Sequence, residues 1–138
     1  MPFTGNATCN DFKYGLINGE FKFDGTQTYK IALYNNSATL TADTTAYTTD
    51  GEISGAGYVA GGQAITPTEG IADGVAYVSF ANVTWSGSFT VRGALIYKDS
   101  GLKPAVCVLD FGSDKVSTNS FTVQFPFAGS TTGLIRLS

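Results

Sequence analysis

The sequence predicts an all-β protein that folds as an antiparallel β-sandwich, with one short helix near the N-terminus. Roughly eight short apolar or alternating segments follow one another, separated by turn residues and without a long helical pattern. Ten Phe, seven Tyr and one Trp are available to fill a core. The 138 residues are enough for one domain, residues 1–138, which we expect to begin with a short extended arm.

A strongly apolar hairpin within residues 90–112 is the centre of the predicted sheet. Its strands, residues 91–97 and 105–111, are apolar at nearly every position, and the polar residues 98–101 form the turn. Continuous apolar strands are typical of strands covered on both faces. We therefore expect one face to lie in the sandwich core. The other face would be covered by the N-terminal segment or by a neighbouring subunit.

The first half of the chain predicts a helix and one clear strand. Thr8 or Asn10 is expected to cap a helix of residues 11–17, because both side chains can accept a hydrogen bond from the first helical turn. Asn18-Gly19 then ends the helix. Residues 28–34 alternate between the two faces of a strand.

Residues 38–62 are the least regular part of the chain and are rich in Thr, Ala and Gly. We expect a long loop with a helical turn at residues 44–47 and a brief extended piece at Ile53. Long loops in compact domains often carry function or interactions, although this one could also be a passive connection.

The second half predicts further strands around the hairpin. Residues 63–67, 75–83 and 121–125 are apolar or alternating, and residues 134–137 form a last short strand. Residues 113–120 are polar, and we expect a loop there.

The chain has an unusually low charge. Charged residues make up 14% of it and the net charge is −3, whereas a typical domain has about 25% charged residues. A surface of Thr, Ser, Asn and Gly suits burial against other protein, because few charges must be desolvated. The alternative is that Thr and Ser simply suit exposed strands. The eight Lys and Arg residues are scattered, which disfavours nucleic-acid binding.

No apolar run approaches the roughly 20 residues of a membrane span. The first residues also lack the basic and apolar regions of a signal peptide. We therefore expect a protein that is made in a cytoplasm and does not leave by the standard secretory route. For the same reason we expect Cys9 and Cys107, the two cysteines, to stay reduced rather than to form a disulfide.

The chain contains no histidine. This removes the usual general base, the commonest metal ligand, and the Ser-His-Asp and Cys-His arrangements. Two distant cysteines without histidine also cannot form a structural zinc site. We therefore expect a protein that is not an enzyme and holds no cofactor or metal.

Two carboxylate pairs are the remaining candidates for glycoside hydrolysis: Asp50 with Glu52, and Asp110 with Asp114. Both pairs lie in turn-like or strand-end segments, where solvated acids are common, and neither matches a calcium-binding loop. The Gly-rich residues 55–62 lack the ending and the following helix of a phosphate-binding loop. Catalysis is therefore disfavoured.

Tyr47, Tyr58 and Trp85 lie in or beside predicted loops. Exposed aromatic rings on a β-sandwich can stack on sugars, which makes a carbohydrate-binding module the second hypothesis. The alternative is that these rings belong to the core or to strand ends.

Several segments together resemble a known family. They are KIALY at residues 30–34, SGAGYVAGG at 54–62, Trp85, RGALIY at 92–97 and VCVLDFGSDK at 106–115. The pattern is similar to that of small proteins encoded in the structural modules of tailed bacteriophages. The characterised relatives are capsid cement, or decoration, proteins with a jelly-roll-like β-sandwich. The resemblance extends over about residues 12–127.

The resemblance implies a non-enzymatic virion protein on the outer capsid surface, which stabilises contacts between major capsid subunits. The alternative is a carbohydrate- or receptor-binding module of a head fibre or tail. From the low charge and the doubly apolar hairpin we also expect a homo-oligomer, most simply a twofold dimer. The expected partner contacts lie in the arm and the long loop. They are Pro2, Phe3, Thr4, Tyr47 and Tyr58.

Overall fold

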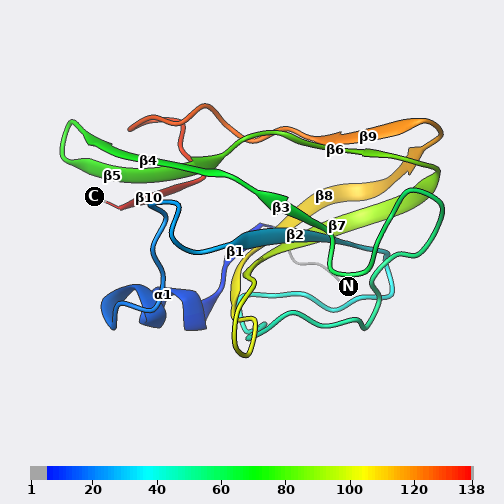
Figure 1. Ribbon diagram of the computed structural model, residues 1–138, viewed down its shortest axis with the longest axis horizontal. Helices are drawn as coiled ribbons and strands as arrows, with labels where there is room; N and C mark the ends of the chain where they lie inside the picture. The colour runs from blue at the N-terminus through cyan, green and yellow to red at the C-terminus, as the bar shows by residue number, and fades with distance from the viewer. Residues whose placement is uncertain (1–5, 138) are drawn as a thin grey trace.

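The structure is a computed structural model that describes residues 6–137. Five strands form its larger sheet. In spatial order they are β1 (Ala7–Thr8), β8 (Ala105–Ser117), β7 (Phe89–Lys98), β2 (Tyr29–Tyr34) and β3 (Gln63–Ile65). All neighbouring strands in this sheet are antiparallel. The apolar hairpin, β7 with β8, lies in the interior of the sheet, as predicted (Figure 1).

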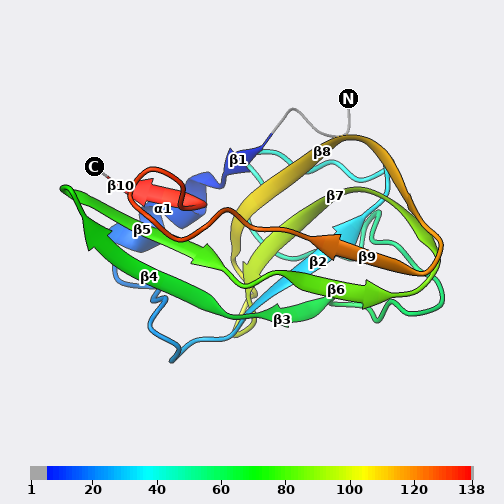
Figure 2. The same ribbon diagram turned by 90° about the horizontal axis from the view of Figure 1, so that it is seen from above.

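A second layer lies across the larger sheet and consists of two small antiparallel sheets placed end to end (Figure 1, Figure 2). One contains β10 (Ile135–Leu137), β5 (Val75–Phe80) and β4 (Pro67–Ala72). The other contains β6 (Val83–Ser86) and β9 (Ser120–Val123). The predicted all-β antiparallel sandwich with one short helix is therefore confirmed.

The short helix α1 (Asn10–Ile17) follows β1 directly and buries Phe12, whose ring meets Phe21 edge-on at a centroid distance of 4.8 Å. The prediction that Thr8 or Asn10 caps it is wrong. The capping position is held by Cys9, without a side-chain hydrogen bond. Thr8 cannot cap the helix because it is paired with Cys107 in β1, and Asn10 is already the first helical residue.

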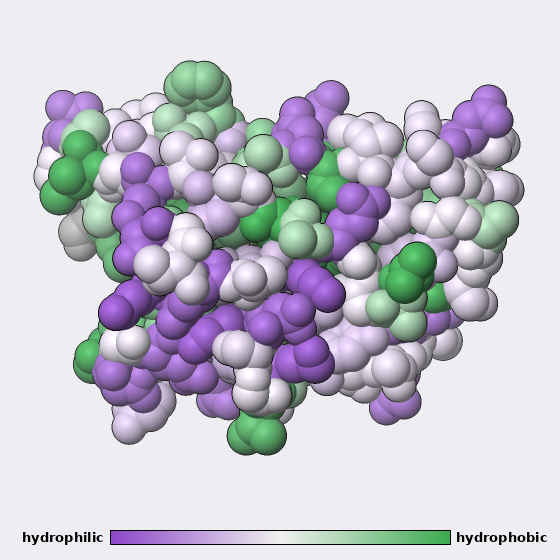
Figure 3. All heavy atoms as spheres, in the orientation of Figure 1, coloured by the Kyte–Doolittle hydropathy of each residue, from purple (hydrophilic) through white to green (hydrophobic). Residues whose placement is uncertain are grey.

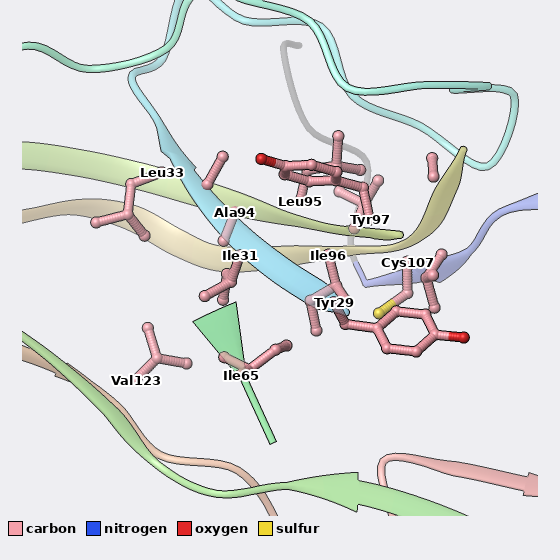
Figure 4. Close-up of a cluster of buried hydrophobic side chains, with 14 of the residues drawn as sticks. Tyr29, Ile31, Leu33, Ile65, Ala94, Leu95, Ile96, Tyr97, Cys107 and Val123 are labelled. Atoms are coloured by element: carbon pink, nitrogen blue, oxygen red, sulfur yellow. The ribbon is translucent and has the colours of Figure 1, made fainter. Parts of the chain in front are cut away.

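The chain's own long loop covers the outer face of the larger sheet, running beneath it in Figure 1. Leu95 and Tyr97 point toward this loop, whereas Ile31 and Leu33 point toward the second layer (Figure 4). The ring of Tyr47 stacks on that of Tyr97 with 4.7 Å between centroids. The chain's own long loop therefore provides cover that we expected from the N-terminal segment or a neighbouring subunit.

Two local predictions fail for polar segments. The helical turn expected at residues 44–47 does not form, because Ala46 instead makes an isolated antiparallel bridge with Pro104. The loop expected at residues 113–120 is wrong too, since β8 continues to Ser117 and β9 begins at Ser120. Residues 112–116 are mostly polar, because this end of β8 is exposed to solvent.

Candidate functional site

Glu52 is the centre of a hydrogen-bond network that fastens the long loop to the sheet. Its Oε1 accepts a hydrogen bond from the Tyr47 hydroxyl at 2.6 Å. Its Oε2 accepts from the Tyr58 hydroxyl at 2.5 Å and from the Gly61 N–H at 2.8 Å. The Tyr58 oxygen in turn accepts from the backbone N–H of Leu33 in the central strand β2, at 3.0 Å. The Glu52 carboxylate thus links three residues within the loop, and the Tyr58 hydroxyl that it holds joins the loop to β2.

These contacts change the interpretation of the aromatic candidates. Tyr58 is 9% exposed and Trp85 2% exposed, so these two rings are not open for stacking on sugars, and the alternative that they belong to the core is confirmed. Both rings belong to the core because the long loop folds back onto the sheet. Tyr47 is partly buried and its hydroxyl is bound to Glu52. Among the predicted contacts, Pro2, Phe3 and Thr4 lie outside the described residues.

The acidic candidates also have structural partners. Glu52 accepts the three hydrogen bonds described above, and its predicted companion Asp50 is exposed on a turn. Asp110 forms an ion pair with Arg92, and Asp114 accepts a hydrogen bond from the Asn36 side chain at 3.2 Å. Within residues 6–137, no group of three His, Cys, Asp or Glu side chains is arranged to hold a metal ion.

The thiols of Cys9 and Cys107 are buried and free in the structure, in agreement with the expected absence of a disulfide. Burial raises the pKa of Cys9 to about 11 and also raises the pKa of Cys107. Because the thiolate is the reactive form of cysteine, both side chains act as packing groups at neutral pH.

Burial raises the pKa of the tyrosines around Glu52. Desolvation is the main cause for each of them, and the Glu52 carboxylate adds to it. The pKa of Tyr97 rises to about 12, and those of Tyr34, Tyr47 and Tyr58 also rise. All four hydroxyls therefore remain neutral far above neutral pH.

Alkaline destabilisation is the expected consequence. Unfolded tyrosines titrate near pH 10, whereas the buried ones titrate higher. Their contribution to stability is complete below pH 10 and is lost as the pH rises through about 12, the pKa of Tyr97. In denaturant unfolding the free energy should be nearly the same at pH 8 and 9, and above pH 10 it should fall by up to ~1.4 kcal/mol per pH unit for each such tyrosine. Phenolate absorbance that rises near pH 10 without loss of stability would contradict this.

Glu52→Ala is expected to lower the free energy of unfolding by about 2–3 kcal/mol, because two tyrosine hydroxyls and one backbone N–H lose their acceptor. Urea titration followed by near-ultraviolet circular dichroism measures this change. Asp50→Ala is the matched control, since Asp50 lies exposed in the same part of the loop, and its effect should stay within ~0.5 kcal/mol. Equal losses in both variants would show that the network does not stabilise the loop.

An apolar groove opens where the two layers separate beside α1. Its inner part, between α1 and the hairpin of β4 and β5, has a volume of about 410 Å³. A middle part beside β10 and an edge part between β1 and β10 continue it, because neighbouring parts share lining residues. The apolar residues that line the inner part are Phe12, Leu16, Phe23, Ile71, Ala76, Val78, Ile135 and Leu137.

The groove is apolar but not closed. Ile71 is 75% exposed and Leu137 54% exposed at its rim, whereas Phe12 and Val78 are buried in its floor. By contrast, the face of the molecule in Figure 3 shows apolar side chains scattered among polar ones. Isolated apolar residues are ordinary on protein surfaces, but a lined groove is a candidate binding surface.

Two cations line the middle part of the groove. The Lys13 Nζ donates to the Asn10 side chain at 3.3 Å, and the Arg136 guanidinium donates to the Thr131 carbonyl at 2.8 Å. Neither cation has a carboxylate within salt-bridge distance in the part of the chain that the structure describes. Among residues 6–137, no acidic residue lines this middle part, and Glu69 lines the inner part.

The sequence did not predict this groove. Its residues come from both ends of the chain and meet only after β10 pairs with β5. The sequence held only a weak signal for the groove. Leu16, Ile71 and Leu137 are apolar residues near the ends of their elements, where the local pattern alone does not call for an apolar side chain.

In comparisons with known proteins, no family model, no curated protein and no solved structure matches the chain. No helix among the described residues is long and apolar enough to cross a membrane.

Proposed function

We propose that this chain is a non-enzymatic structural protein of a tailed-phage virion. It is a capsid decoration protein, which binds the outer surface of the assembled shell and stabilises contacts between major capsid subunits. The observation that carries the proposal is the resemblance of the segments at residues 30–34, 54–62, 92–97 and 106–115 to that family. The missing histidine and the low charge agree with it.

The roles of the residues in these segments support the proposal. Tyr58 fastens the long loop through Glu52, Arg92 pairs with Asp110, and Gly62 lies against the backbone of β2. These are scaffold roles, and a pattern made of scaffold residues is what proteins with a common fold and no common catalytic site would share. The carbohydrate-binding alternative loses support, because Tyr58 and Trp85 are buried.

The mechanism is mass action on the shell. A protein that binds the assembled lattice, and not its dissociated subunits, stabilises the lattice by an amount that grows with its concentration relative to Kd. Many copies on a symmetric shell let individually small interfaces add up. The few surface charges reduce the desolvation that each contact requires.

The test uses phage particles from a genome that encodes this chain. Mass spectrometry of purified virions should detect the protein at a fixed ratio to the major capsid protein. Heads that lack it should release DNA at a lower temperature, and adding the purified protein should restore the release temperature. Its absence from virions, or unchanged heat stability of heads without it, would overturn the proposal.

Two related expectations stay predictions. The twofold dimer was inferred from a sheet face that a second copy was expected to cover, but the long loop covers that face. Light scattering of the purified protein tests the dimer directly. Deleting residues 2–5 tests the contacts expected of Pro2, Phe3 and Thr4. This deletion spares Ala7 and Thr8, which pair with β8.

A further inference from the structure

We propose that the groove beside β1 and β10 binds an extended segment of a protein partner. The segment has apolar side chains at alternate positions and an acidic residue beside Lys13 and Arg136. The inference rests on the proposed function only in taking the partner to be a protein. Its test uses the purified chain and peptides, so that it can fail while the virion test succeeds, or the reverse.

The first argument is the apolar lining. The inner part of the groove, about 410 Å³, lies within the ~300–1,000 Å³ of typical ligand pockets, so it can receive side chains of a partner. Its floor is built from buried Phe12 and Val78, which the fold holds in place. The exposed rim residues Ile71 and Leu137 would lose contact with water when a partner binds.

The second argument is the free edges of two strands. β1 is the last strand of the larger sheet and β10 the last strand of the three-stranded sheet, so each has one neighbour among the described strands. Both lie on the same side of the molecule in Figure 2, and residues of both line the edge part of the groove. Edge strands present unpaired backbone N–H and C=O groups, to which an extended peptide can add.

An added strand also explains the expected alternation. Side chains of an extended chain point to opposite faces in turn, so that every second one would enter the groove. The remaining side chains would face solvent and need not be apolar. An acyl chain could occupy the apolar part, but it would leave the backbone groups of β1 and β10 unpaired.

The third argument is charge. The protein has a net charge of −3, yet Lys13 and Arg136 are the charged residues of the middle part. Their hydrogen bonds go to neutral oxygens, an amide for Lys13 and a backbone carbonyl for Arg136. A carboxylate from the partner would be a stronger acceptor for both cations. The groove should therefore select acidic over basic segments.

The experiment is a selection of displayed random ten-residue peptides on the immobilised full chain. We expect enriched peptides with apolar residues at alternate positions and at least one Asp or Glu. A fluorescent copy of the most enriched peptide should bind in solution. Its affinity should fall at least tenfold in Ile71→Ser combined with Leu137→Ser, and about tenfold in Lys13→Gln combined with Arg136→Gln.

The control variant is Leu102→Ser, because Leu102 is 92% exposed and does not line the groove. This variant should bind the peptide with unchanged affinity. All variants change exposed side chains, and thermal melting verifies that each is folded. No enrichment, enrichment without acidic residues, or unchanged affinity in the groove variants would overturn the inference. Binding of dodecanoate without any selected peptide would assign the groove to an acyl chain. Self-association lost in Ile71→Ser would assign it to a second copy.

Discussion

Cys107→Asp is expected to lower the free energy of unfolding by roughly 3–5 kcal/mol, the range for an uncompensated buried charge. Cys107 is 5% exposed in β8, between β7 and β1. A carboxylate at this position would have to be desolvated or protonated on folding. Urea unfolding at pH 7 measures the loss. Cys107→Ser is the control, because it has a similar size and no charge, and it should cost much less.

A pH series distinguishes the charge from mere loss of packing. Burial raises the pKa of the new carboxyl in the folded state above its unfolded value near 4. The folded state of the Asp variant is therefore favoured below pH 4 and penalised as the pH rises through the raised pKa. The difference between the Asp and Ser variants should shrink at pH 4. A constant difference across pH 4–7, or an Asp variant as stable as the parent, would show that this strand is not buried centrally.

The parts of the fold that the sequence predicted are those determined by local patterns. The hairpin of β7 and β8 was predictable because its strands are continuously apolar and Lys98–Gly101 is polar between them. The helix end was predictable too, since Asn18 is its C-terminal cap and Gly19 follows with a φ of 82°. Such signals act over a few residues and need no knowledge of the tertiary structure.

The errors arose where distant segments meet. Residues 113–117 look like a loop because they are mostly polar, but the pairing of residues 115–117 with β7 makes them part of a strand. Tyr58 looks like a loop aromatic because glycines surround it, but Glu52 and Leu33 hold its hydroxyl in the interior. The local composition indicates whether a segment is exposed, but it does not indicate which distant segment provides its hydrogen-bond partners.

The groove was out of reach of the sequence for the same reason. Its cations are separated by most of the chain, and only the pairing of β10 with β5 brings Arg136 to the side of α1 that carries Lys13. A single sequence cannot show that neither cation has an acidic partner. The absence of any histidine-based site, by contrast, follows from composition alone, because no fold can supply a missing residue type.

Gly62→Ala is expected to lower the free energy of unfolding by about 2–5 kcal/mol. Gly62 has a φ of 79°, and left-handed backbone costs a residue with a Cβ ~1–2 kcal/mol. A Cβ there would also overlap the carbonyl oxygen of Ile31 in β2 and lie 2.9 Å from the Cα of Ala32. Overpacking of this kind costs ~1–3 kcal/mol, and a central strand has little freedom to move away. Thermal melting and urea unfolding measure the sum.

Gly74→Ala separates the two costs. Gly74 has nearly the same φ, 77°, in the turn between β4 and β5, and a Cβ built there meets no atom within 4 Å. This variant should therefore lose only the ~1–2 kcal/mol of the left-handed backbone. The difference between the two variants measures how tightly the end of the long loop is packed on β2. If both lost the same free energy, the loop would not be held against the central strand, and the Glu52 network could not be what fastens it there.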